Sequence, residues 1–179
     1  KDKRGDFKIV ENLSFVGGMG HPGGGRNDIP NRLKSKFFLF NMVLPSTVSV
    51  DNIYGSILRA RFIPKNGFGE RPMAISKQLT AITIDVWKKI GKNLLPTPAR
   101  FHYIFNMREL SRVFQGILET PGNVVGADEV RLCSLWRHET TRVFGDKLAR
   151  QQDKDFVDKV IAESMQQHFG EELFAKVQE

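Results

Sequence analysis

The distribution of hydrophobic residues changes character near position 46. Before it stand two short apolar runs, Leu13–Val16 and Phe37–Val43, separated by a glycine-rich segment from Gly17 to Gly25. Short apolar runs bounded by turn residues are typical of strands buried in parallel sheets. We therefore expect two strands here, joined by a loop and by a short helix over Ile29–Ser35.

After position 46, apolar residues recur every three or four positions, which is the spacing of one helical face. The longest series predicts a helix of about 20 residues that stops at Pro96. Its apolar members are Ile75, Leu79, Ile82, Val86, Ile90 and Leu94. Other series predict helices that begin at Ser49, Asn106, Asp128 and near Asp153, and Asn106 is followed three positions later by an acid, as in a capping box. We expect about five helices and no internal repeat.

These patterns predict a mainly α fold with an α+β portion at the N-terminal side. The change of period places a boundary near Leu44. Residues 1–44 would be the C-terminal remnant of an α/β layer, and residues 45–179 a helical subdomain. The chain begins at Lys1 and enters a strand-like segment almost at once, so we expect a piece of a larger polypeptide.

The composition, with 40% hydrophobic and 26% charged residues, is that of an ordinary globular protein. Its net charge of +7 is compatible with an anionic partner, but the basic residues are scattered, as on a solvated surface. The single Cys133 excludes an internal disulfide and a cysteine-based zinc site. His138 and Glu139 begin an H-E-x-x-H pattern, but Arg142 stands at the second ligand position, so we expect no metal site. No apolar stretch predicts a transmembrane helix.

Two phosphate-binding sequence patterns and two arginines bear on whether this chain could bind a phosphate. Gly18–Gly23 fits the dinucleotide pattern G-x-G-x-x-G, but the glycines that follow oppose the required helix, and no acid stands about 20 positions beyond. The sequence contains no P-loop pattern G-x-x-x-x-G-K-[ST]. Arg26 follows the glycine loop and Arg108 lies in a first helical turn, where the helix dipole disfavours cations. Either arginine could face a bound phosphate, with simple solvent exposure as the alternative.

Three long strings then resemble one family: FVGGMGHPGGGRNDIPNRLK, LLPTPARFHYIFNMRELSRVFQG and LWRHETTRVFGDKL. They are similar to the third AAA+ module in the motor ring of dynein heavy chains, and the wording GHPGGGRND is similar to the axonemal type. The resemblance covers essentially the whole chain. It implies that residues 1–44 end the large α/β subdomain of the module and that residues 45–179 form its helical lid.

The resemblance also implies roles for single residues. Arg108 matches the sensor-2 arginine, which reaches from the lid to the module's own nucleotide. Gly20 falls where a polar sensor-1 residue is usual, so Asn27 or another group would have to replace it. The region that supplies an arginine finger to the preceding module's nucleotide offers three basic candidates: Arg26, Arg32 and Lys36. Such a finger stabilises charge on the transferring phosphoryl group.

By the same resemblance, the parent protein would be an ATP-driven microtubule motor of the axoneme in a cilium or flagellum. Its module would hold ATP or ADP with Mg²⁺, and its partners would be neighbouring AAA+ modules, microtubules and the intermediate and light chains. The present chain lacks the P-loop and the acidic metal-and-water motif, so we expect no catalytic residue and no hydrolysis from it alone. We expect neither a membrane nor a nucleic acid as partner.

Two alternatives of other classes remain at the sequence level. A basic helical module that binds nucleic acid would concentrate Lys and Arg on one face with exposed aromatic residues. A small dinucleotide-binding enzyme would need a complete βαβ unit. Most of the fourteen phenylalanines fall on predicted buried stripes, which argues against the first alternative.

Overall fold

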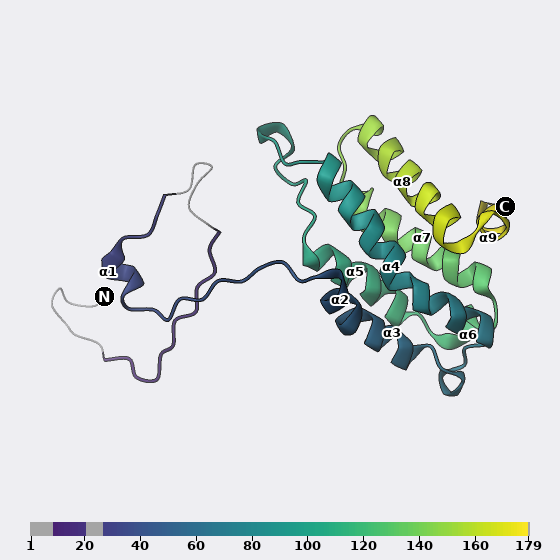
Figure 1. Ribbon diagram of the computed structural model, residues 1–179, viewed down its shortest axis with the longest axis horizontal. Helices are drawn as coiled ribbons and strands as arrows, with labels where there is room; N and C mark the ends of the chain where they lie inside the picture. The colour runs from purple at the N-terminus through teal and green to yellow at the C-terminus, as the bar shows by residue number, and fades with distance from the viewer. Residues whose placement is uncertain (1–8, 21–26, 179) are drawn as a thin grey trace, which may run out of the picture. The chain divides into compact units, whose positions relative to one another are not determined.

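A computed structural model describes residues 9–20 and 27–178, and these fall into two compact units, Lys1–Val43 and Leu44–Glu179 (Figure 1). Each unit is described by itself below. In the described residues the chain is mainly helical, which confirms the predicted fold class. No helix among them is long and apolar enough to cross a membrane.

The first unit has one short helix among its described residues, α1 (Asn31–Lys34). It lies within the predicted range, and Pro30 is its capping residue. The Asp28 carboxylate accepts a hydrogen bond from the Ile29 N–H at 2.8 Å and pairs with Lys34 at 2.7 Å. This short ion pair therefore joins the turn before α1 to its last residue.

The two strands expected in this unit are absent from the described residues. Leu13–Val16 and Phe37–Val43 are extended or irregular, and their side chains are largely exposed, as Val16 at 98% and Phe38 at 90% illustrate. A strand forms only when a neighbouring strand takes up its backbone hydrogen bonds and another layer covers its apolar face. The described part of this unit contains neither a neighbouring strand nor a covering layer, so the two apolar segments do not form strands there.

The second unit begins with three consecutive helical pieces: α2 (Thr47–Val50), a π-helical stretch (Asp51–Gly55) and α3 (Ser56–Arg61). The capping residue is Ser46, whose Oγ accepts the Ser49 N–H at 3.1 Å, and not Ser49 as predicted. Leu58 is buried, whereas Ile53 and Ile57 are about half exposed. The wider π turn shifts the register of side chains around the axis, so these residues do not share one buried face.

Helix α4 (Glu70–Asn93, 24 residues) is the central element of this unit. All six apolar positions of the predicted stripe are buried. It follows a tight loop with Gly67 at φ +86°, and its backbone turns away at Leu94 before Pro96. Helices α5, α7 and α8 all pack against α4 (Figure 1), and its apolar stripe belongs to the core that they share.

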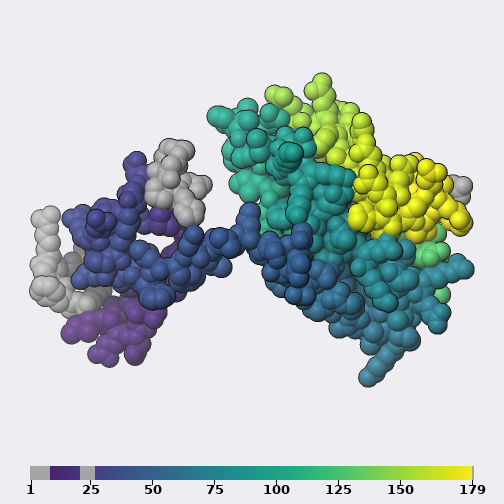
Figure 2. Space-filling view, in the orientation of Figure 1, coloured from purple at the N-terminus to yellow at the C-terminus, as the bar shows by residue number. Residues whose placement is uncertain are grey.

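The other helices are α5 (Met107–Glu119), α6 (Gly122–Val125), α7 (Glu129–Phe144), α8 (Gln151–Phe169) and α9 (Glu171–Gln178). The predicted caps Asn106 and Asp128 are confirmed, since each side chain accepts a backbone N–H of the first turn. Gly170, at φ +86°, is the residue at which α8 ends. Figure 2 shows the residues of this unit as one continuous packed body, with the C-terminal helices covering one side.

The core contains few polar groups, and most of them are paired. Trp136 is fully buried, and its Nε1–H donates to Thr83 Oγ1 at 2.9 Å, while Thr83 donates to the Leu79 carbonyl at 2.6 Å. Cys133 is also buried, and burial raises the pKa of its thiol to about 12. The thiol therefore behaves as a small apolar side chain.

Candidate functional site at the start of helix α5

The first turn of α5 is fixed by a complete capping box. The Asn106 side chain accepts the Arg108 N–H at 3.0 Å, and the Glu109 carboxylate accepts the Asn106 N–H at 3.0 Å. Arg108, between them, extends into solvent with 67% of its side chain exposed. The backbone is thus rigid at the point where the predicted sensor arginine begins, while its guanidinium is accessible.

The Glu109 side chain is only 5% exposed, although it is ionisable. Two cations stand near its Oε1 atom: Arg108 Nη2 at 3.8 Å and Lys147 Nζ at 3.8 Å. A buried carboxylate requires such counter-charges and hydrogen bonds, since removal from water is costly. Glu109 therefore links the capping box to the loop between α7 and α8.

Lys147 reaches this site from that loop. Its ammonium group donates to the Ile104 carbonyl at 2.7 Å and lies 4.1 Å from the centroid of the Phe105 ring. Burial lowers the pKa of Lys147; the Glu109 carboxylate raises it, and the charges of Arg112 and Arg108 lower it. Lys147 therefore fastens the segment immediately before α5 to a distant part of the chain.

The same segment is anchored at two further points. Trp87 on α4 donates its Nε1–H to the Phe105 carbonyl at 3.0 Å. Tyr103 is buried, and its hydroxyl donates to Asp153 at the start of α8 at 2.8 Å, while Arg100 pairs with the same carboxylate at 3.3 Å. Residues on α4 and α8 thus both hold the segment immediately before α5. These contacts fix the point from which the Arg108 side chain extends into solvent.

The other predicted site residues lie in the first unit. Gly20, Asn27, Arg32 and Lys36 are all exposed, and among the described residues no ion pair involves Arg32 or Lys36. Arg26 lies outside the described residues. Arg108 belongs to the second unit.

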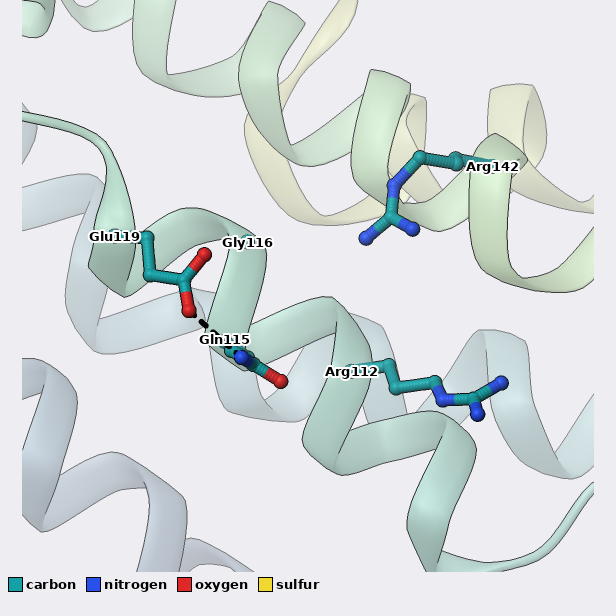
Figure 3. A pocket seen from close by; sticks show the side chains of 5 residues that line it. All are labelled: Arg112, Gln115, Gly116, Glu119 and Arg142. Atoms are coloured by element: carbon teal, nitrogen blue, oxygen red, sulfur yellow. Dashed lines mark hydrogen bonds between the residues drawn. The ribbon is translucent and has the colours of Figure 1, made fainter.

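A shallow pocket of about 340 Å³ lies beside this site, between α5 and α7 (Figure 3). Gln115 donates to Glu119 at 2.7 Å across one turn of α5. The Arg142 Nε–H donates to the buried Glu139 carboxylate at 3.0 Å. No pattern in the sequence predicts this pocket. Its lining combines both signs of charge: Arg112, Gln115, Gly116, Glu119 and Arg142.

Comparison with known protein families identifies the family to which this chain belongs. Residues 79–177, more than half of the chain, match the AAA+ lid domain family. The chain belongs to this family. Residues 1–45 match the P-loop containing dynein motor region, which confirms the resemblance to dynein heavy chains. Arg108 thus lies within the part of the chain that matches the AAA+ lid domain.

Individual relatives agree with this assignment. The chain is 40% identical to the dynein gamma chain of the flagellar outer arm from Chlamydomonas reinhardtii, over 98% of its own length. It is 40% identical to dynein axonemal heavy chain 5 from Mus musculus over 96% of its length, and 38% identical to dynein axonemal heavy chain 10 from Homo sapiens over 97%. In each case it spans only 4% of the relative's length.

Proposed function

We propose that this chain is the lid side of an ATP-binding AAA+ module in the motor ring of an axonemal dynein heavy chain. The whole protein would be an ATP-driven microtubule motor in a cilium or flagellum. Its module would hold ATP or ADP with Mg²⁺. Residues 1–44 would be the end of the large subdomain of that module, and residues 45–179 its lid. Neighbouring AAA+ modules, microtubules and the intermediate and light chains would be its partners.

Within this module we propose that Arg108 is the sensor-2 residue. The observation that carries this role is the exposed guanidinium at the rigidly capped first turn of α5. A guanidinium forms paired hydrogen bonds with phosphate. The first-turn N–H groups of Arg108 and Glu109 already bond to Asn106, so the guanidinium would be the group that holds the phosphate, and the lid could follow it as a rigid body.

Position alone does not distinguish Arg108, because other arginines occupy first turns. Arg71 on α4 lies 3.6 Å from Glu129, and Arg131 on α7 lies 3.4 Å from Asp128. The carboxylate near Arg108 is different, since it is buried and has Lys147 as a second counter-ion. The sensor role therefore rests on the family match together with this arrangement.

The first unit would supply the remaining contacts. Gly20 stands at the sensor-1 position, and having no side chain it cannot orient a water or a γ-phosphate, so Asn27 is the nearby polar substitute. Arg26, Arg32 and Lys36 are the candidates for the finger that reaches the preceding module's nucleotide. These roles are proposals from the family resemblance.

The test is nucleotide retention in the full-length heavy chain, with the other nucleotide-binding modules inactivated. Arg108→Ala should speed the release of a fluorescent ADP analogue by about tenfold or more, because one charge-assisted contact is worth about 1.5–3 kcal/mol.

The matched control is Arg71→Ala, which removes an exposed arginine from the same position of another helix. It should leave the release rate unchanged. Equal rates for the Arg108→Ala variant and the unmodified protein would refute the sensor role.

A further inference from the structure

The two cations beside Glu109 differ in their freedom to move. The Arg108 side chain is 67% exposed, whereas that of Lys147 is 25% exposed. Lys147 is also held by the Ile104 carbonyl and the Phe105 ring. Arg108 can therefore turn towards an outside anion while Lys147 stays in place.

A buried carboxylate that lost both counter-ions would be strongly destabilised. If Lys147 were absent, Arg108 would be the one cation within ion-pair distance of the Glu109 carboxylate among the described residues. An arginine that must neutralise its own neighbour is less available to a phosphate, because binding the phosphate would leave the carboxylate unpaired. With Lys147 present, Glu109 keeps a counter-charge and continues to cap the Asn106 N–H.

We propose that Lys147 is a positioning residue that neutralises Glu109 and thereby releases Arg108 to bind the phosphate of a nucleotide. The proposal rests on the sensor role of Arg108 and adds a residue that sets the availability of that sensor. It also assigns a function to the loop between α7 and α8, which lies about one-fifth of the chain away in sequence.

The experiment measures release of a fluorescent ADP analogue from this module in the same full-length heavy chain. Lys147→Met should speed release about tenfold, as loss of the Arg108 contact does. Lys147→Arg, which keeps the charge, should release at nearly the original rate. The matched control is Lys159→Met, since Lys159 also lies 3.8 Å from a glutamate, Glu163, but on the exposed face of α8.

A second substitution separates charge balance from mere support of the fold. Glu109→Gln removes the carboxylate while its amide oxygen can still accept the Asn106 N–H. In the Lys147→Met background it should restore slow release, because nothing then retains Arg108. A lysine that only supports the fold predicts that the double variant is at least as impaired as Lys147→Met. Unchanged release in Lys147→Met, or no restoration in the double variant, would overturn the proposal.

Two further arms keep the result interpretable. If Lys147→Met fails to fold, as a melting curve would show, the double variant with Glu109→Gln decides: release as slow as in the Glu109→Gln single variant supports the proposal, and faster release overturns it. If Arg108→Ala has no effect, the sensor role itself fails. If Arg108→Ala speeds release but Lys147→Met does not, only the role of Lys147 fails.

Discussion

Gly116 on α5 faces the buried carboxylate of Glu139 on α7, at the place where these two helices pack together. A Cβ atom at this position would overlap Glu139 Oε2 and its carboxyl carbon. The Glu139 side chain cannot move aside freely, because it is mostly buried and paired with Arg142. A glycine inside a helix usually destabilises it, but at position 116 the close approach of Glu139 leaves no room for a side chain.

We predict that Gly116→Ala lowers the free energy of unfolding by about 1–3 kcal/mol, as overpacking does in a close-packed interior. The control is Gly91→Ala on α4, where the nearest atom to the new methyl group would be Phe105 Cβ at an ordinary 3.9 Å. That change should raise the free energy by about 0.5–1 kcal/mol through helix propensity. Urea unfolding of both variants tests the pair, and a Gly116→Ala variant as stable as Gly91→Ala would contradict the packing argument.

At the scale of elements, the sequence predicts the long helices well, because their stripes and caps are local. The stripe of α4 and the capping box of α5 are both confirmed. The four-residue α6 and the eight-residue α9 were not predicted, since they are too short to show a repeat. The π-helical stretch was not predicted either, since such turns are rare and the spacing of apolar residues does not mark them.

The strands were predicted from correct apolar runs but do not form in the described residues. Strand pairing is non-local, so an apolar run indicates only that a strand can form where other strands are present to pair with it. Leu13–Val16 and Phe37–Val43 expose apolar side chains that a sheet would bury. In the proposed motor ring the rest of the large subdomain would supply those partners.

We therefore predict that the backbone amides of Phe37–Val43 exchange with solvent at least about a hundredfold more slowly in the full-length heavy chain than in the 179-residue chain. Amides of α4 should be protected in both proteins and serve as the internal control. Hydrogen exchange with mass spectrometry measures both segments at once. Equally fast exchange of Phe37–Val43 in the two proteins would show that no sheet incorporates this segment.

At the scale of the whole molecule, the candidate site was only partly predictable. Arg108 could be predicted because the capping box around it and the string that resembles dynein heavy chains are contiguous in the sequence. Lys147 could not, since it meets Glu109 only through the packing of α5 against the end of α7. No local pattern marks a lysine whose partner lies in another helix.

The central claim is that Arg108 contacts the nucleotide of its own module. The most direct measurement is a structure of the full-length motor ring with ADP bound at this module. We predict a distance of about 2.7–3.2 Å between an Arg108 guanidinium nitrogen and a phosphate oxygen, with Lys147 still beside Glu109. A guanidinium more than about 6 Å from every phosphate oxygen, beyond the reach of a direct ionic contact, would contradict the account.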